Sequence, residues 1–286
     1  MSTRPVLIQT LAEMRQALRP YRASGSRTGL VPTMGALHTG HASLIRQARS
    51  ECSLVVVSIY VNPTQFGPNE DYSKYPRRLQ ADLETCARER VDYVFAPSDN
   101  EMYGGGSLTK VHVDRLTDGL CGAFRPGHFD GVCTVVAKLF NIVQPDAAYF
   151  GQKDAQQVAV IKRMVADLNF PLEIVVCPTV READGLAMSS RNAYLSPEQR
   201  RQAPCLWQAL QAGCEAIGRG VRTSDEIAAI MRQKIEEIGP VPIDYLDVYD
   251  AVSLRRPDTV GGTVLLAGAI RIGGTRLIDN VVVEVQ

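Results

Sequence analysis

Residues 28–61 read TGLVPTMGALHTGHASLIRQARSECSLVVVSIYV and contain the strongest secondary-structure signals of the chain. This stretch opens with a short apolar segment over residues 28–31 and passes through a loop that contains glycine. A helix is predicted from His41 to Glu51, because its apolar residues recur at helical spacing. The run from Leu54 to Val61 is almost unbroken in Val and Ile, which is typical of a strand buried in a parallel sheet. The stretch therefore predicts a strand, a loop, a helix and a second strand in succession.

The same alternation continues to about residue 180. The residue patterns predict helices over 72–90, 132–143 and 154–168, and strands over 91–96, 147–150 and 173–180. Such alternation predicts an α/β fold, namely a Rossmann-like, doubly wound parallel sheet with helices on both faces. In such sheets the loops after the carboxyl ends of the strands lie along one edge, which is where ligands bind.

The pattern changes after residue 180, where a smaller α+β C-terminal domain is predicted. A capping box at 196–199 predicts a helix reaching about Gly218, and a second box at 223–226 predicts a helix that stops at Gly239. Residues 264–272 and 277–285 then read as two antiparallel strands joined by a tight turn. We therefore expect two domains, spanning residues 1–180 and 181–286.

Composition narrows the function without identifying it. The 286 residues are 45% hydrophobic, and 31 basic residues balance 31 acidic ones, so neither a nucleic acid nor an anionic membrane is expected as a partner. No apolar run approaches the roughly 18 residues that a membrane span needs, and the stretch from Met1 to Pro5 lacks the apolar character of a signal peptide. Seven cysteines without a C-x-x-C pair are typical of reduced thiols. A cytoplasmic globular protein is expected.

The densest functional signal is the segment from Pro32 to His41. His38 and His41 are two of only four histidines, and they stand three residues apart where a strand meets a helix. At that spacing both imidazoles can face one point beside free backbone N–H groups, and the helix dipole there favours an anion such as phosphate. Gly35 and Gly40 would let the backbone approach a ligand closely. Two alternatives remain, since the histidines could be surface residues or half of a metal site that lacks a nearby third ligand.

Two further segments carry groups suited to phosphate. Residues 188–192 read Met-Ser-Ser-Arg-Asn, and their hydroxyls and guanidinium can bind phosphate oxygens, although an ordinary polar loop is the alternative. Lys153 stands where a strand leads into a helix and offers a point charge for phosphate or carboxylate, unless it is a solvated surface lysine. All three segments lie at predicted strand ends or at the domain boundary, so we expect them to converge on one cleft.

The H-x-G-H motif in the first half and Met-Ser-Ser-Arg in the second resemble the paired signatures of class I aminoacyl-tRNA synthetases and related nucleotidylyltransferases. Those enzymes act at the α-phosphate of ATP and release pyrophosphate. A narrower resemblance, to the pantothenate synthetase (pantoate–β-alanine ligase) family, rests on six segments that occur in order, at residues 32–41, 58–67, 72–77, 125–129, 150–157 and 188–192.

This resemblance implies an ATP-dependent carbon–nitrogen ligase of pantothenate and coenzyme A biosynthesis. Such an enzyme condenses pantoate with β-alanine through a pantoyl-adenylate and releases AMP and pyrophosphate. It implies ATP as a substrate, Mg²⁺, and a cytoplasmic homodimer. It also implies that the domain over residues 1–180 binds ATP and pantoate while the domain over residues 181–286 closes over the active site.

The resemblance also assigns residues. It makes His41, His38 and Lys153 catalytic, with His41 a proton donor and Lys153 on the phosphate or the pantoate carboxylate. It assigns ATP binding to Met34, Gly35, Ala36, Leu37, His38, Thr39, Gly40, His41, Gly151, Gln152, Lys153, Asp154, Val180, Met188, Ser189, Ser190 and Arg191. Gln65 and Gln157 are implied to bind pantoate, and Gln65 also β-alanine. No residue is expected to bind metal directly, although Asp82 is a candidate for holding Mg²⁺ through water.

Three rival functions remain to be weighed. A nucleotidyltransferase that keeps AMP or CMP on its product would lack the segment from Asn62 to Phe66, which is present. A tRNA-binding or regulatory protein with an inactive synthetase core is disfavoured by the zero net charge and the lack of a basic arm. A Rossmann dehydrogenase is disfavoured because no G-x-G-x-x-G opens the first predicted helix of the unit over residues 28–61.

Overall fold

A computed structural model describes residues 4–68 and 70–285, so the first three residues of the segment weighed as a signal peptide lie outside it. The chain divides into two compact units. Unit 1 comprises the chain up to Asp114, Arg125–Gly151 and Gln157–Pro178, and unit 2 comprises Arg115–Phe124, Gln152–Gln156 and the chain from Thr179 onward. Over the described residues, no helix is long and apolar enough to cross a membrane. All seven cysteines fall within the described ranges and are free thiols.

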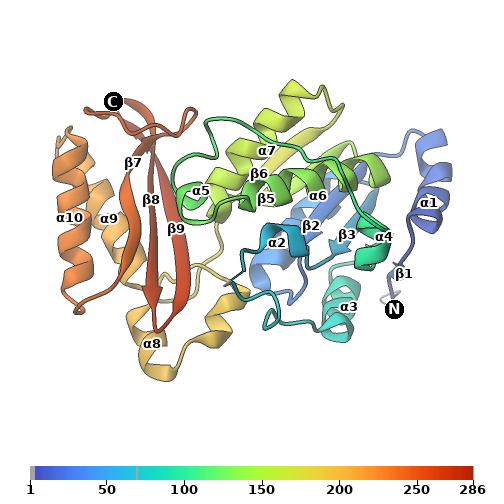
Figure 1. Ribbon diagram of the computed structural model, residues 1–286, viewed down its shortest axis with the longest axis horizontal. Helices are drawn as coiled ribbons and strands as arrows, with labels where there is room; N and C mark the ends of the chain where they lie inside the picture. The colour runs from blue at the N-terminus through green and yellow to red at the C-terminus, as the bar shows by residue number, and fades with distance from the viewer. Residues whose placement is uncertain (1–3, 69, 286) are drawn as a thin grey trace. The chain divides into compact units, whose positions relative to one another are not determined.

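Unit 1 is built on a parallel sheet (Figure 1). In the described chain its strands are β1 (Val6–Ile8), β2 (Thr28–Thr33), β3 (Leu54–Ile59), β4 (Tyr93–Phe95), β5 (Ala147–Gly151) and β6 (Glu173–Cys177). Their order across the sheet is β1-β4-β3-β2-β5-β6. From β2 the chain steps through β3 to β4 in one direction, whereas β5 and β6 lie on the other side of β2. The carboxyl ends of β2 and β5 therefore flank the point where the strand order reverses, which is where sheets of this kind bind ligands.

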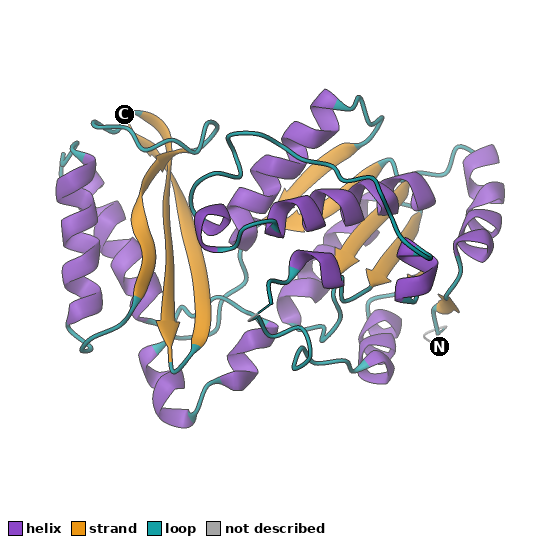
Figure 2. Cartoon of the chain, viewed as in Figure 1, coloured by secondary structure: helices purple, strands orange, loops and turns teal. Residues whose placement is uncertain are grey.

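Helices cover both faces of this sheet (Figure 2). They include α1 (Leu11–Ala23), α2 (Thr39–Glu51), α3 (Leu79–Arg88), α4 (Asp99–Tyr103), α6 (His128–Val143) and α7 (Ala155–Asp167), the last starting in unit 2. Val31 and Val57 pack against Ile45 of α2 in one buried cluster. Successive strand residues point to opposite faces, and the intervening Leu30 and Val56 are also fully buried. A strand that is buried on both faces has a nearly continuous run of apolar residues, as β3 does. The parallel sheet with helices on both faces confirms the predicted Rossmann-like α/β fold.

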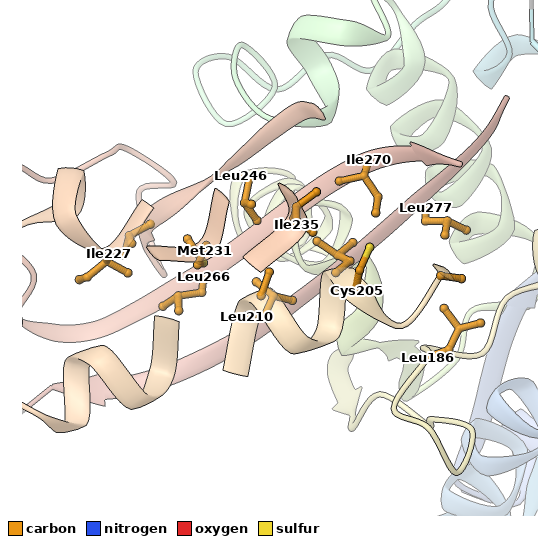
Figure 3. Packing of buried hydrophobic residues seen from close by; sticks show 14 of the residues in the cluster. Leu186, Cys205, Leu210, Ile227, Met231, Ile235, Leu246, Leu266, Ile270 and Leu277 are labelled. Carbon is orange, nitrogen blue, oxygen red and sulfur yellow. The ribbon is translucent and has the colours of Figure 1, made fainter. Parts of the chain in front are cut away.

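Unit 2 contains a small antiparallel sheet. Its elements in the described chain are α5 (Cys121–Phe124), α8 (Pro197–Gln202), α9 (Cys205–Gly218), α10 (Ser224–Glu236), β7 (Ile243–Asp250), β8 (Gly262–Ile272) and β9 (Thr275–Val285). The strand order is β7-β8-β9, and α9 and α10 lie on one face of the sheet (Figure 1). Figure 3 shows the core between them, where Leu210 and Met231 from the helices meet Leu246, Leu266 and Ile270 from the strands.

Two predicted helix boundaries in unit 2 need correction. The capping box at Ser196 is confirmed, because Ser196 Oγ accepts from Gln199 N and Gln199 Oε1 accepts from Ser196 N. The helix it opens does not reach Gly218, since it ends at Gln202 and α9 starts beyond Pro204. Proline has no N–H and its ring collides with the preceding turn, so the helix breaks there.

The second predicted capping box, at residues 223–226, does not form. Thr223 precedes α10 but caps no backbone N–H, and its hydroxyl donates instead to Glu226 Oε2 at 2.6 Å. α10 ends at Glu236, three residues before Gly239. In unit 1 the helix predicted over 72–90 spans only Leu79–Arg88, and the strand predicted over 173–180 ends at Cys177, just before a proline.

Candidate functional site

The loop after β2 leaves the sheet at the point where the strand order reverses. Thr33, the last residue of β2, uses its hydroxyl to accept from Gly35 N at 3.1 Å and to donate to Ser58 O at 2.7 Å. Gly35 and Ala36 both have positive φ, of +79° and +50°. This left-handed pair turns the chain sharply from the strand end toward α2. The segment predicted to bind the nucleotide therefore begins with a tight turn whose backbone conformation is well defined.

Asp82 of α3 anchors this turn. Its Oδ2 accepts from Ala36 N at 3.0 Å and its Oδ1 accepts from Leu37 N at 2.7 Å. The residue is only 2% exposed. Burial raises the pKa of Asp82, while the hydrogen bonds from Leu37 and Ala36 act in the opposite direction. Both oxygens are committed to the loop, so its geometry favours loop anchoring over the role in holding Mg²⁺ that the sequence suggested.

His38 and His41 form an imidazole capping box at the start of α2. Gly40 N donates to His38 Nδ1 at 3.1 Å, and His38 N donates to His41 Nδ1 at 3.3 Å. The ring centroids lie 4.0 Å apart. Because a backbone N–H can only donate, each Nδ1 is an unprotonated acceptor, and the proton of the neutral ring resides on Nε2. The expectation of free backbone N–H groups is wrong for His38 and Gly40, since the imidazoles bind them.

Gln65 lies in the short 3₁₀ turn η1 (Pro63–Gln65) that follows β3. Its Oε1 accepts from Asn62 Nδ2 at 3.1 Å, and its Nε2 contacts Met34 Sδ at 3.1 Å. Gln65 is 9% exposed and Asn62 is 1% exposed. The structure thus brings together Met34 and Gln65, two residues that the sequence assigned to different substrates. Asn62, which donates to the Gln65 amide, was given no role from the sequence, although an Asn directly before a Pro is a recognisable start of a helical turn.

Gly151 and Gln157 are the other predicted residues of unit 1. Gly151 ends β5, whose residues Ala147 and Ala148 pair in parallel with Gly29 and Leu30 of β2. Continued along the strands, that register places Gly151 at the same sheet edge as the end of β2. Gln157 is partly buried in the first turn of α7.

In unit 2, Gln152, Lys153 and Asp154 form the 3₁₀ turn η2 (Gln152–Asp154). Asn280 of β9 holds this turn, since its Nδ2 donates to Lys153 O at 2.9 Å and to Gln152 O at 3.0 Å. The Lys153 side chain is 19% exposed, and its Nζ lies 3.8 Å from Asp154 Oδ1. Asn280 was not found from the sequence, because it stands inside a strand pattern with no motif around it.

Val180 and Met188 face each other in unit 2. Met188 N donates to Val180 O at 2.9 Å, and Arg181 forms an antiparallel bridge with Ala187. The Arg181 guanidinium carbon lies 3.6 Å from the centre of the Trp207 ring, and its Nη2 donates to Asp279 Oδ1 at 3.0 Å. Stacking and ion pairing together fix this hairpin, and with it two residues that the resemblance assigns to the adenosine pocket.

Ser189, Ser190 and Arg191 follow directly from that hairpin. Ser189 Oγ accepts from Arg191 N at 3.3 Å and caps the 3₁₀ helix η3 (Ser190–Tyr194). The cap places Ser190 and Arg191 in the first turn of η3, so the Ser190 hydroxyl and the Arg191 guanidinium come from neighbouring positions. The predicted residues therefore form two groups, with Met34 to His41, Gln65, Gly151 and Gln157 in unit 1 and the remainder in unit 2.

Comparisons with known proteins agree over almost the whole chain. The family model described as pantoate-beta-alanine ligase matches residues 6–282. A pantothenate synthetase of Moorella thermoacetica is 57% identical over 280 residues, which cover 98% of this chain and 99% of the relative.

Solved structures give the same result for the fold. A pantothenate synthetase from Thermus thermophilus superposes with a TM-score of 0.92 at 47% identity, covering 96% of this chain and 98% of the other. A pantoate-beta-alanine ligase from Francisella tularensis, solved with beta-gamma ATP and beta-alanine, superposes with a TM-score of 0.80 at 35% identity and covers 97% of each chain. The matches span both units and all six segments on which the resemblance rests, so the chain belongs to the pantoate–β-alanine ligase family.

Proposed function

We propose that this chain condenses pantoate with β-alanine in two steps that consume ATP and release AMP and pyrophosphate. The observation that carries this proposal is the pair of imidazoles at the start of α2. Capping through Nδ1 leaves each neutral ring a donor at Nε2, at the sheet edge where ligands bind. A matched pair of N–H donors suits phosphate oxygens whose negative charge increases during attack at phosphorus.

The chemistry explains why a nucleotide is needed. A carboxylate does not acylate an amine at neutral pH, because its oxygen is a poor leaving group. In the first step the pantoate carboxylate attacks the α-phosphorus of ATP, the bond to the β-phosphate oxygen breaks, and pyrophosphate leaves. In the second step the amine of β-alanine attacks the carbonyl of the mixed anhydride, the bond to the AMP oxygen breaks so that AMP leaves, and the amine loses its proton to solvent.

His38 and His41 stabilise charge on the α-phosphate, and His41 donates a hydrogen bond from its Nε2 proton to an α-phosphate oxygen. Lys153 neutralises the same phosphate or the pantoate carboxylate, and Ser189, Ser190 and Arg191 bind the rest of the triphosphate. The segment from Met34 to Leu37, with Thr39 and Gly40, encloses the phosphates, while Gly151, Gln152, Asp154, Val180 and Met188 line the adenosine pocket.

Pantoate binding is assigned to the Gln65 and Gln157 amides, because a primary amide both donates to and accepts from hydroxyl groups. Gln65 is also assigned to β-alanine. The Francisella relative was solved with β-alanine and an ATP ligand, which supports these substrates for the family.

Mg²⁺ is proposed to enter with ATP on its phosphate oxygens. Within residues 4–68 and 70–285, no group of three or more His, Cys, Asp or Glu side chains is placed to hold a metal ion. Asp82 gives both oxygens to backbone N–H groups. A protein-held Mg²⁺ therefore does not fit these residues, whereas an ion carried by the triphosphate needs few protein ligands.

A coupled assay of AMP or pyrophosphate, with pantoate, β-alanine and ATP omitted in turn, tests the proposal. Without β-alanine, pyrophosphate should appear in a single burst of about one equivalent per site, because the adenylate stays bound. Without pantoate, no AMP should form, and equal AMP formation there would remove the proposed function. Mass analysis of the product excludes the rival nucleotidyltransferase, which would leave AMP or CMP attached.

The cytoplasmic location and the homodimer expected from the resemblance are retained as part of this proposal. Light scattering coupled to size exclusion tests the assembly, since a homodimer should elute at twice the 31.3 kDa chain mass.

A further inference from the structure

The segment from Arg125 to Gly131 contacts the turn that carries Gln65. His128 Nδ1 lies 2.8 Å from the backbone oxygen of Gln65, and Arg125 Nη2 donates to the same oxygen at 3.3 Å. A carbonyl oxygen can only accept, so His128 Nδ1 carries a proton and donates it. All of these residues belong to unit 1, and the assigned chemistry leaves Arg125 and His128 without a role.

The remaining nitrogen of His128 completes a chain of hydrogen bonds. Its Nε2 accepts from Arg125 Nη1 at 3.0 Å, which fixes a tautomer opposite to that of His38 and His41. Arg125 in turn donates to Glu70 through Nε at 2.7 Å and Nη2 at 2.6 Å. The side chains of Arg125 and Glu70 are 14% and 25% exposed. A bidentate guanidinium–carboxylate pair of this kind is held rigidly, so Arg125 and His128 present fixed donors to Gln65.

Gly131 holds the same turn from within α6. A Cβ at Gly131 would lie 2.4 Å from Thr64 O and 2.6 Å from Gln65 N, so only a glycine lets the helix lie directly against that peptide. Gly131 O also accepts from Asn62 Nδ2 at 3.1 Å, and Asn62 Nδ2 donates to Gln65 Oε1 as well. The backbone and the side-chain amide of Gln65 are therefore both tied to the start of α6.

We propose that Arg125, His128 and Gly131 form a clamp that positions the Gln65 amide for pantoate. This inference rests on the proposed role of Gln65 in binding that substrate. The three residues act through Gln65 and are positioning residues. A glutamine side chain has three rotatable bonds, so a small shift of its backbone displaces the amide and weakens binding of pantoate and β-alanine, which Gln65 is proposed to contact, but not of ATP. A purely structural network would instead change stability without favouring one substrate.

The test compares steady-state KM values for pantoate and for ATP in matched variants. His128→Leu removes the donor to Gln65 O and should raise the pantoate KM about tenfold, the effect of one lost hydrogen bond, with the ATP KM within about twofold. In His128→Asn the amide nitrogen takes the place of Nδ1, so most of the pantoate affinity should return. Gly131→Ala should also raise the pantoate KM, and Arg125→Lys provides a milder variant if Gly131→Ala does not fold.

Asp130→Asn is the control on the same helix. Asp130 binds His112 Nδ1 at 2.6 Å and takes no part in the clamp. This variant should leave both KM values unchanged.

A double variant distinguishes the clamp from the function on which it rests. If His128 acts through Gln65, adding His128→Leu to Gln65→Ala should raise the pantoate KM no further than Gln65→Ala alone. Additive effects, or an equal rise in the ATP and pantoate KM values, would overturn the clamp. A normal pantoate KM in Gln65→Ala would remove both the assignment of Gln65 and the clamp, while the ligase reaction stands. Failure of the wild-type protein to form AMP from pantoate would overturn the proposed function itself.

Discussion

The carboxylate of Asp82 accepts the backbone N–H of Leu37 at 2.7 Å, across 45 positions in sequence. Its second oxygen accepts from the neighbouring Ala36. One buried side chain on α3 thus holds two successive peptides of the proposed nucleotide loop. The shape of that loop depends on a residue that no local motif includes.

Asp82→Asn should therefore weaken ATP binding. An amide of the same size keeps one acceptor, but its NH₂ then faces a backbone N–H and leaves it buried without a partner. The free energy of unfolding should fall by about 1–3 kcal/mol, and the ATP KM should rise. Denaturant unfolding and initial rates measure both effects. An unchanged ATP KM would show that the loop keeps its shape without this anchor.

Gly35→Ala should damage the same loop by a different route. Gly35 has φ of +79°, and a Cβ there would lie 2.9 Å from Asp82 Oδ2 and 3.0 Å from Ile59 Cγ2. Both the backbone conformation and the contact with the anchor oppose a side chain. We expect a lower melting temperature and a higher ATP KM. Gly218→Ala, at the end of α9 with no atom within 4 Å of the added Cβ, is the matched control and should leave activity intact.

Two variants of His41 separate capping from catalysis. His41→Ala removes both the cap on His38 N and the Nε2 donor, whereas the Asn oxygen in His41→Asn replaces Nδ1 as acceptor. Both should slow single-turnover pyrophosphate release by roughly 10²–10³, the usual effect of losing one preorganised donor. Only His41→Ala should also lower the melting temperature. Near-normal release in His41→Asn would remove the imidazole from the chemistry.

Lys153→Ala should slow pyrophosphate release by a similar factor, roughly 10²–10³. Asn280→Ala leaves the ammonium in place but removes the donors to Lys153 O and Gln152 O. Asn280→Ala should slow pyrophosphate release less than Lys153→Ala does. The loosened η2 turn would still bring the Lys153 ammonium to the phosphate in part of the molecules. If Asn280→Ala left the rate unchanged, η2 would not need this contact.

The stability of unit 2 should depend on pH through Asp244. Arg276 and Arg271 donate to its carboxylate at 2.7 Å and 2.9 Å. Burial by itself would raise the pKa of Asp244, but the hydrogen bonds from Arg276 and Arg271 bring it below its ordinary value. A carboxyl whose pKa is lowered on folding stabilises the fold above its unfolded pKa of about 3.9. That stabilisation is lost as pH falls through the folded value.

The unfolding free energy of the wild-type protein should therefore exceed that of Asp244→Asn at neutral pH. The difference should shrink as pH falls below about 4. Parallel urea titrations across this range measure it. A difference that is constant with pH would mean that the charge of Asp244 contributes nothing to the free energy of unfolding.

Much of the fold could be predicted from local patterns. Runs of Val and Ile marked β3, and helical spacing marked α2, because each element must bury its own apolar face. The turn at residues 273–274 correctly predicted the pairing of β8 and β9. Elements with weak patterns were missed, including β1 and β7. The helix α1 was missed as well, although Thr10 and Glu13 form a capping signal at its start.

The order of the amino acids establishes which chemical groups are present and which of them are close neighbours along the chain, such as His38 and His41. The strand order, which brings the ends of β2 and β5 to one edge, emerges only in the folded chain. The same holds for the anchoring of the loop by Asp82 and for the hydrogen bond that His128 donates to Gln65 from 63 positions away. Periodicity and capping are local properties that a short segment expresses alone, whereas a hydrogen bond between distant residues exists only after the sheet has brought their segments together.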